Sequence, residues 1–583
     1  MNALRSSLLI VFGLLVLSTD GRSEPKQPTV YEALEADYRQ GYLTEAQYTA
    51  YQLLAIRRSE ALPEAYRATE QPIVRLGTGL AMRARQLLTT AAGEDQRLLQ
   101  QALSRPIQLP FSRLSASKKF RLHYALEGPD AVADAFLIQA AEAFDRAYYL
   151  IVEELGYPAP PPDPVDGPEY DVYIHNIGDY GFSTPEEPSG SADFPYGYTS
   201  FVQIDNDFIN TYTKGIDGMK VTAAHEFFHM VQLGMRTFTS TRLDTRWFYE
   251  ACASWMEDVA YDEINDYLQY LPHYLNHLDE GIYTFNGIHE YGTALFLHML
   301  EKKYERSIVR NLWEKFAGEE LYDAIDQVLQ RRNSSLANEL MDHLVWNYFT
   351  GSRADTVQYY SEGADYPELK PNLTQDLQQT LSFSDETQLL SGRYVRVNVQ
   401  NFGDLSVQPQ FASPHRWRYA IISKTVNLPA EIHGGVGNEA SMIADLSASS
   451  EIMVITTNVG IPVNDLRVKE SYQYQLTFGK TSTLQAEVRK ISPNPFVPDR
   501  HDEKIRIDVR LVERVREFSW FILDENGRSV YRADVRLDSQ KCGDFSFWWD
   551  GRSNDDEPLP SGVYMVFIQA DQAVRPQKFV LLR

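Results

Sequence analysis

The sequence predicts a multidomain α+β protein, in which a mostly helical part with a small sheet precedes two all-β, sandwich-like domains. Its 583 residues are more than one hydrophobic core usually holds. Apolar residues recur three and four positions apart through most of the first part of the chain, which is typical of amphipathic helices. After about residue 369 they alternate with polar residues instead, as in half-buried strands. The order of these patterns predicts helices first and strands second.

The first part of the chain is expected to contain a secretory signal and a helical region. In residues 1–24, Arg5 precedes a short apolar run, and small and polar residues follow, as in a signal peptide. Residues 25–110 carry helical periodicity. We interpret this region either as an ordinary helical scaffold or as a pro-segment that masks a site elsewhere in the chain. It contains no cysteine that could block a metal, so masking would be steric.

The composition is that of a soluble globular protein, with 43% hydrophobic residues and a formal net charge of −25. Such acidity argues against binding to nucleic acid or to anionic membranes. Cys252 and Cys542 are the only cysteines and fall in different predicted domains, which excludes a disulfide framework. After the signal, no segment is long and apolar enough to span a membrane. We therefore expect a secreted or cell-surface protein with no membrane span after signal removal.

Residues 111–368 are expected to form a mostly helical domain with a small sheet. A turn at Gly128-Pro129-Asp130 leads into a long helix predicted at residues 131–155, and helical periodicity continues from Glu301 to Phe349. Alternation predicts a strand at residues 120–124, and residues 171–174 and 198–204 are also expected to be strands.

The most informative motif is HEFFH at residues 225–229, an H-E-x-x-H sequence. On a helix, His225 and His229 lie one above the other on one face and can bind a single ion, with Glu226 beside it. The neighbouring residues are apolar nearly all round, and in such a buried helix charged groups are rare unless they are paired or bind metal. Bound zinc lowers the pKa of a water to about 7, and a carboxylate can take its proton. The alternative is a chance grouping on an ordinary helix, which explains the pattern less economically.

The third metal ligand is predicted to be Glu250. A polar stretch, residues 236–245, can connect two helices, and Glu250 lies among aromatic and small residues, as a buried ligand requires. Glu257 shares the helix face of Glu250 and is the rival candidate. Because Glu257 begins an acidic pair, we expect it to lie on a solvated helix face.

These residues resemble the gluzincin metallopeptidases, in which a glutamate on the next long helix completes the zinc site. HEYGTALFLHML at residues 289–300 resembles the helix that follows the zinc helices in the M1 aminopeptidase group. A tyrosine there hydrogen-bonds the oxyanion, which implies this role for Tyr291, although the tyrosine–glycine spacing is shorter here. A packed core tyrosine is the alternative. The G-x-M-E-N segment that holds a free amino terminus is missing, which favours an endopeptidase over an exopeptidase.

Residues 120 to about 366 resemble more closely a family of secreted bacterial metalloproteases first noticed in myxobacteria. The shared stretches are LHYALEGPDAV, EELGYPAPPPD, YDVYIHNIGDYGFSTPE, FVQIDNDF and AAHEFFHMVQ. In zinc peptidases of this group a strand edge binds the substrate backbone, which implies that role for residues 198–204. Asp205-Asn206-Asp207 could ligate Ca2+, but a turn or a helix cap is the simpler explanation.

Residues 369–482 and 483–583 are expected to form two all-β domains. The first has the alternation of a sandwich and no catalytic constellation. In the second, strands flank an Asn526-Gly527 turn, and WWDGR, LPSGVY and KFVLLR follow. This segment resembles the immunoglobulin-like domain related to flagellar hook-capping proteins and to type IX secretion sorting domains. The resemblance implies secretion machinery as a partner; a plain accessory β domain is the alternative.

Together these features predict a secreted zinc endopeptidase that acts on protein or peptide substrates. The ligands of one catalytic Zn2+ would be His225, His229 and Glu250. Glu226 would be the base and later the proton donor, and Tyr291 would steady the oxyanion. The alternative is a cell-surface adhesion or binding protein whose metal site is structural or vestigial.

Overall fold

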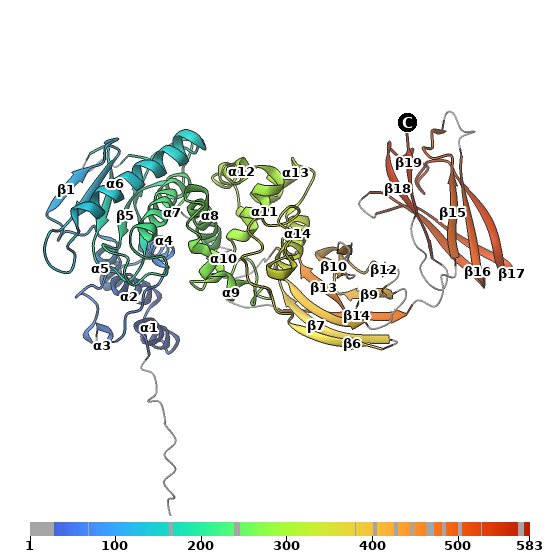
Figure 1. Cartoon of the computed structure of the whole chain (residues 1–583), viewed down its shortest axis with the longest axis horizontal. Coiled ribbons are helices and arrows are strands. Elements are labelled where there is room, and N and C mark those ends of the chain that lie inside the picture. The colour runs from blue at the N-terminus through green and yellow to red at the C-terminus, as the bar shows by residue number, and fades with distance from the viewer. Residues whose placement is uncertain are drawn as a thin grey trace, which may run out of the picture.

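The computed structural model of the chain describes residues 28–67, 69–162, 167–237, 245–378, 380–399, 405–424, 430–443, 446, 449, 451–461, 471–480, 486–498, 504–525, 528–569 and 577–583. The predicted signal peptide at 1–24 and the predicted Asn526-Gly527 turn lie outside these residues. Figure 1 shows a mostly helical first part and a second part of strands, which follow each other along the long axis. This arrangement confirms the prediction of a multidomain α+β protein.

The described chain begins with a group of short helices. They are α1 (Val30–Arg39), α2 (Glu45–Ile56), α3 (Glu64–Arg67), α4 (Gly77–Leu88) and α5 (Gly93–Leu103). Thr29 and Thr44 start α1 and α2 with capping boxes, in which the threonine side chain and a side chain three residues later satisfy each other's backbone amides. The apolar faces of these helices form a separate hydrophobic core. Among described residues, the buried side chains that join this core from the rest of the chain are Ile177 and Phe182.

A five-stranded sheet follows, with strand order β1-β2-β3-β5-β4. Its strands are β1 (Phe111–Leu114), β2 (Phe120–Tyr124), β3 (Tyr170–Ile174), β4 (Gly181–Pro188) and β5 (Tyr198–Ile204). The sequence predicted β2, β3 and β5, which pair in parallel, and missed the antiparallel strands β1 and β4. The prediction that residues 198–204 offer a free edge is wrong, because β5 lies between β3 and β4. The edge strand on this side is β4.

Helices then cover the sheet and continue away from it (Figure 1). They are α6 (Asp134–Tyr148), α7 (Gly215–Met235), α8 (Arg246–Ala260), α9 (Leu271–Tyr274), α10 (His289–Gly292), α11 (Ala294–Tyr304), α12 (Ser307–Phe316), α13 (Leu321–Gln330) and α14 (Leu336–Tyr348). The long helix predicted at 131–155 begins at Asp134 and ends in a π-helical segment, Tyr149–Glu154. Within the described residues, no helix is long and apolar enough to cross a membrane.

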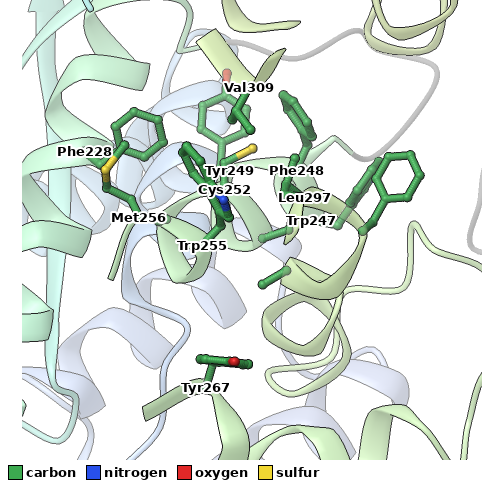
Figure 2. Close-up of a cluster of buried hydrophobic side chains, with 14 of the residues drawn as sticks. Phe228, Trp247, Phe248, Tyr249, Cys252, Trp255, Met256, Tyr267, Leu297 and Val309 are labelled. Atoms are coloured by element: carbon green, nitrogen blue, oxygen red, sulfur yellow. The ribbon is translucent and has the colours of Figure 1, made fainter. Parts of the chain in front are cut away.

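The main hydrophobic core lies between the sheet, α7, α8 and the later helices. Figure 2 shows aromatic side chains of α7 and α8 clustered there, among them Phe228, Phe248 and Tyr249. The ring of Trp313, from α12, stacks on Phe248 with centroids 5.2 Å apart and meets Tyr249 edge-on at 4.8 Å. Aromatic pairs of this kind stabilise a core beyond their buried area. The two helices that carry the candidate metal ligands are therefore held rigidly.

Two sheets follow the helices. One has the order β11-β10-β13-β8-β6 and the other the order β12-β9-β14-β7. The strands are β6 (Leu373–Leu377), β7 (Thr380–Gln388), β8 (Arg393–Val399), β9 (Leu405–Phe411), β10 (Trp417–Ser423), β11 (Glu431–Val436), β12 (Ser441–Ile443), β13 (Glu451–Asn458) and β14 (Ser471–Lys480). The first sheet packs on α14, where the hydroxyl of Tyr394 donates to the carbonyl of Leu344 at 2.7 Å. One face of this sheet thus joins the core of the helical part, while the two sheets also have a separate core of their own.

The last strands have a core of their own. They are β15 (Ala486–Ser492), β16 (Ile505–Leu523), β17 (Ser529–Trp549), β18 (Gly562–Gln569) and β19 (Gln577–Leu581), and they form one antiparallel sheet. Trp549, Phe579 and Ile522 are among its buried residues. This segment lies at the far end of the molecule from the N-terminal helices (Figure 1).

Candidate metal centre

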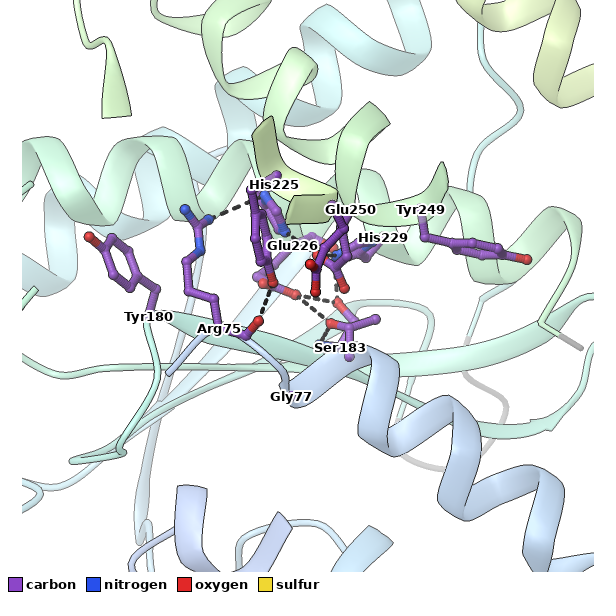
Figure 3. A network of polar contacts seen from close by, with 12 residues as sticks. Arg75, Gly77, Tyr180, Ser183, His225, Glu226, His229, Tyr249 and Glu250 are labelled. Atoms are coloured by element: carbon purple, nitrogen blue, oxygen red, sulfur yellow. Dashed lines mark hydrogen bonds and ion pairs between the residues drawn. The ribbon is translucent and has the colours of Figure 1, made fainter. Parts of the chain in front are cut away.

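Two helices bring the predicted ligands together. Every residue of α7 from Val221 to Met235 is buried, since the helix is enclosed by the sheet, α6 and α8. His225 and His229 lie on the face of α7 that meets α8, and Glu250 lies on α8 opposite them (Figure 3). Oε2 of Glu250 is 3.2 Å from Nε2 of His225 and 3.2 Å from Nε2 of His229. One donor atom from each of the three side chains lies within 4.8 Å of the others.

This donor set fits zinc. Two imidazole nitrogens and one carboxylate oxygen are a common protein set at catalytic zinc, which keeps a fourth position open. Ligands about 2.0–2.1 Å from a tetrahedral ion lie about 3.3 Å apart, which matches both separations from Glu250. Each histidine therefore needs its proton on Nδ1, so that the Nε2 lone pair faces the ion.

Glu257 and Gln232 provide that arrangement. Nδ1 of His225 is 2.6 Å from Oε1 of Glu257, and this oxygen accepts the hydrogen bond of the Nδ1–H group. Nδ1 of His229 is 2.6 Å from Oε1 of Gln232, and the Gln232 amide nitrogen donates to the carbonyl of Tyr249 at 3.1 Å. Such outer partners fix the tautomer and the ring orientation of metal-bound histidines.

The expectation that Glu257 lies on a solvated helix face is wrong. Its side chain is buried, and it also accepts a bond from the guanidinium of Arg75 at 2.7 Å. Burial raises the pKa of Glu257, but Arg75 and His225 outweigh this effect and lower it overall. The physical reason is the face shared with Glu250: seven residues along a helix is two turns, so Glu257 follows the same seam toward α7. Glu257 therefore supports His225, a candidate ligand.

Glu226 lies beside the ligand cluster on α7. Its Oε2 accepts a bond from the hydroxyl of Ser183 at 2.9 Å and lies 3.4 Å from the hydroxyl of Thr78. Burial raises the pKa of Glu226, against the opposing effect of His229 and His225. A carboxylate whose pKa is raised is a stronger base than an ordinary glutamate. Figure 3 shows Glu226 next to Ser183 and the histidines.

Tyr291 is close to the cluster, on the short helix α10. Its ring centroid lies 6.2 Å from that of His225, and its hydroxyl donates to the backbone carbonyl of Arg75. Burial and the charge of Glu250 raise its pKa well above the ordinary value, so the phenol stays protonated and remains a donor. The structure thus places Tyr291 near the centre, with a backbone carbonyl as its present partner.

The N-terminal helical region reaches this centre. Arg75 lies just before α4 and Thr78 in its first turn, and both contact residues around the ligands. The side chains of His225 and Glu226 are 2% exposed and that of His229 is 0% exposed, so the centre is closed to solvent. Sequence reasoning missed Arg75, Thr78, Ser183 and Gln232. Only Gln232 carried a signal, because it lies on the motif helix within one turn of His229.

The residues considered as a Ca2+ site form a hydrogen-bonded turn. In Asp205-Asn206-Asp207, the carboxylate of Asp205 accepts bonds from the amides of Phe208 and Ile177 at 2.7 and 3.3 Å. Asn206 donates to the carbonyls of Pro129 and Ala131, both at 3.0 Å. These bonds are those of a turn that ties two loops together. Within the described residues, the one further group of acidic side chains close enough for an ion is Asp258, Asp262 and Glu362.

Comparison with known proteins identifies the C-terminal segment only. Residues 497–573 match the family described as the FlgD Ig-like domain. This match and the antiparallel strands support the predicted immunoglobulin-like domain there. No curated protein matches the chain.

Solved structures add no fold assignment. PliG of Aeromonas hydrophila, a periplasmic lysozyme inhibitor of g-type lysozyme, is 12% identical over 19% of this chain and 98% of its own, with a TM-score of 0.15. PorZ of Porphyromonas gingivalis, a surface component of the type IX secretion system, is 21% identical over 19% of this chain and 14% of its own, with a TM-score of 0.12. A GH2 β-galacturonidase from Eisenbergiella tayi is 11% identical over 35% of each chain, with a TM-score of 0.12. TM-scores this low define no common fold.

Proposed function

We propose that this protein is a secreted, zinc-dependent endopeptidase. The observation that carries the proposal is the convergence of His225, His229 and Glu250 on one point, with the carboxylate of Glu226 beside it. Burying these charged groups in an apolar core is costly unless they bind a cation or pair fully. The outer bonds from Glu257 and Gln232 further support a metal site, because they aim both Nε2 atoms inward.

Zinc at this site would lower the pKa of a bound water and polarise the carbonyl of a peptide bond. In this proposal Glu226 would accept the proton of the attacking water at Oε2 and pass it to the leaving nitrogen. The hydroxyl of Ser183 holds that oxygen in position, at 2.9 Å. The phenol of Tyr291 can donate to the oxygen that becomes negative, an interaction that counts most in the transition state.

The edge strand β4 is the natural place for a substrate backbone. Strand addition to a free edge is a common way to bind an extended peptide. β4 begins at Gly181, carries Ser183 next to Glu226, and is antiparallel to β5. A peptide along β4 would therefore lie beside the metal ligands. The C-terminal immunoglobulin-like segment would serve export or attachment at the cell surface, by contact with secretion machinery.

The test compares the protein purified from culture medium with its Glu226→Gln variant. The amide keeps the shape of the side chain but cannot take the proton, so we expect full zinc occupancy and a loss of casein hydrolysis of at least a hundredfold. Glu142→Gln, on the exposed side of α6, is the matched control and should behave as the wild type. Undiminished, chelator-sensitive hydrolysis by Glu226→Gln would refute the assignment.

The alternative is a surface adhesion or binding protein with a structural metal site, and the closed centre favours it. A structural zinc needs no access for substrate, whereas a peptidase does. An assay of the processed, secreted form distinguishes the endopeptidase from the binding protein. If that form holds stoichiometric zinc but shows no chelator-sensitive cleavage of a peptide library, the metal site is structural.

A further inference from the structure

Most buried apolar side chains of the N-terminal region, residues 28–103, form a core of their own, while Met82 of α4 belongs to the main core. Its hydrophobic core is formed by its own helices and receives Ile177 and Phe182 from the rest of the chain. The loop that follows α5 has no regular structure at residues 105–110. Ile107, which is 95% exposed, and Gln108 project from it between the buried Pro106 and Leu109, and Arg105 is tied by ion pairs to Asp171 and Glu186. Exposed loops of this kind are the preferred sites of proteolytic cleavage. The region therefore has the build of a separable unit joined by an accessible connection.

One segment of this region, Val74–Thr78, occupies the place beside β4. The amide of Val74 donates to the carbonyl of Gly178 at 2.9 Å, just before the strand. The hydroxyl of Thr78 accepts a hydrogen bond from the amide of Ser183, in the strand, at 2.9 Å. The carboxylate of Asp179 accepts hydrogen bonds from the amides of Leu76 and Gly77 at 3.3 and 3.1 Å. The segment thus uses backbone groups of the edge that an incoming peptide would need.

The same segment also uses the groups proposed for catalysis. Thr78 lies against Oε2 of Glu226, and the carbonyl of Arg75 accepts the phenol proton of Tyr291. The Arg75 carbonyl therefore lies where the carbonyl of a substrate would meet its oxyanion donor. Figure 3 shows Arg75 and Gly77 against the histidines and Ser183.

The side chain of Arg75 fills a pocket that matches a guanidinium group. One terminal nitrogen donates to Glu257 at 2.7 Å and the other to Asp266 at 2.8 Å. The guanidinium carbon lies 4.5 Å from the ring centroid of Tyr180 and 5.2 Å from that of Tyr291. Two carboxylates on separate nitrogens with aromatic rings on the faces select arginine over lysine, which offers one compact ammonium group.

We propose that the N-terminal region is a tethered inhibitor, and that the pocket filled by Arg75 binds an arginine side chain of the substrate once that region is removed. This inference rests on the proposed function. Removal of the N-terminal region would take the Arg75 guanidinium away from the buried carboxylates of Glu257 and Asp266, which is costly. An arginine side chain of a substrate would supply a guanidinium in its place. Because the Arg75 carbonyl faces Tyr291, the arginine belongs to the residue that supplies the cleaved carbonyl. Water then adds to that carbon, the carbon–nitrogen bond breaks, and the water proton passes through Glu226 to the amine.

The first test releases the N-terminal region from the full chain. A recognition sequence for a site-specific protease is inserted after Ile107, and hydrolysis is measured before cleavage and after separation of the N-terminal fragment. The substrates are paired fluorogenic peptides with arginine or its uncharged isostere citrulline before the cleaved bond. We expect chelator-sensitive hydrolysis to rise at least tenfold on removal and to be at least tenfold faster for arginine. Equal rates before and after removal, or for both peptides, would overturn the inference.

A substitution provides a second route to the open form. A Cβ at Gly77 would lie 2.3 Å from Cβ of Phe182, so Gly77→Val should push the segment off β4 in the uncut chain. Gly318→Val is the matched control, because a Cβ there meets no atom within 4 Å. Gly77→Val should raise hydrolysis of the arginine peptide at least tenfold over both the wild type and the control. No rise in a folded Gly77→Val protein would contradict masking by this segment.

A binding measurement separates failure of this inference from failure of the proposed function. The probe is a labelled peptide of residues 71–80, with arginine or citrulline at position 75, added to the cut protein carrying Glu226→Gln. We expect at least tenfold weaker binding of the citrulline peptide, and a smaller difference in Asp266→Asn, which contacts Arg75 but no metal ligand. Arginine-selective binding without hydrolysis by any form would reject the peptidase and keep the pocket. Chelator-sensitive hydrolysis with equal binding of both peptides would reject the pocket and keep the peptidase.

Discussion

Oε1 of Glu257 lies 2.6 Å from Nδ1 of His225, on the side of the imidazole ring away from Glu250. A carboxylate in this position holds the proton on Nδ1 and leaves Nε2 free to bind metal. It also increases the basicity of the ring. Glu257 and Glu250 therefore have separate roles around one histidine, although both are buried glutamates on the same face of α8.

Replacing Glu257 with glutamine should weaken metal binding without abolishing it. The amide can still accept the Nδ1 proton, but the charge that strengthens His225 is lost. We expect zinc affinity to fall about 10–100-fold, the range seen when outer partners of metal ligands are changed. Competition with a chromophoric chelator measures it, and Glu314→Gln, about half exposed on α12, is the control. An unchanged zinc affinity would show that Glu257 does not orient His225.

Replacing Glu250 should have the larger effect, because it removes a ligand. We expect Glu250→Ala to lose zinc at concentrations where Glu257→Gln is still saturated, as judged by metal analysis after dialysis. The order of the two effects is the discriminating result. If Glu250→Ala kept one zinc per chain while Glu257→Gln lost it, the ligand assignment between these glutamates would have to be exchanged.

The part of the centre that could be predicted from sequence is the part that short helical spacing determines. His225 and His229 are one turn apart, and Glu250 follows on the next helix, so local geometry alone brings the α7 pair to one face. The same holds for strands such as β5, whose predicted bounds match the observed ones.

The missed features depend on long-range packing. Arg75 meets Glu257 across 182 residues of sequence, and Thr78 meets Glu226 across 148. No periodicity connects residues so far apart. β4 was missed because its sequence, GFSTPEEP, carries prolines and acidic residues that are unusual in a strand; an edge position tolerates them. The error about β5 follows from this omission, since β4 covers its free side.

The junction between α14 and the first β part should unfold together with the helical part. Leu344 packs there against Gly392, since a Cβ added to Gly392 would lie 2.4 Å from Cδ2 of Leu344. We expect Leu344→Ala to lower the free energy of unfolding of both parts by about 2–5 kcal/mol, because a cavity forms in their shared core. Hydrogen exchange followed by mass spectrometry reads each part separately. Protection of β16 and β18 should stay unchanged, since their core is separate.

The reciprocal variant completes this comparison. Ile568 is buried in the C-terminal core, and Ile568→Ala should destabilise that sheet by a similar amount, about 2–5 kcal/mol. Exchange in α14 and β13 should not change. Loss of protection in all parts with either variant would show that the C-terminal segment unfolds together with the rest.

Acid should destabilise the helical part through His343. Burial lowers the pKa of His343 to about 3, from an ordinary value near 6.5. Between these two values the unfolded chain binds a proton at this side chain and the folded chain does not, so stability falls as the pH drops. The loss is about 1.4 kcal/mol for each pH unit within that window.

The test compares two variants of this buried group. His343→Gln removes the titrating imidazole, while Tyr360→Phe removes only the hydroxyl that lies 3.1 Å from Nδ1 of His343 and leaves the imidazole in place. Each substitution should lower the free energy of unfolding by about 1–3 kcal/mol at pH 7, because a buried polar group loses a hydrogen-bond partner. When the pH is lowered to about 4.5, the difference in the free energy of unfolding between His343→Gln and the wild type should shift by about 2–3 kcal/mol in favour of the variant. The corresponding difference for Tyr360→Phe should persist. Urea unfolding of the metal-free chain, followed by tryptophan fluorescence, measures the stability of each protein. Parallel pH dependence of all three would mean that the pKa of His343 is the same in the folded and the unfolded chain.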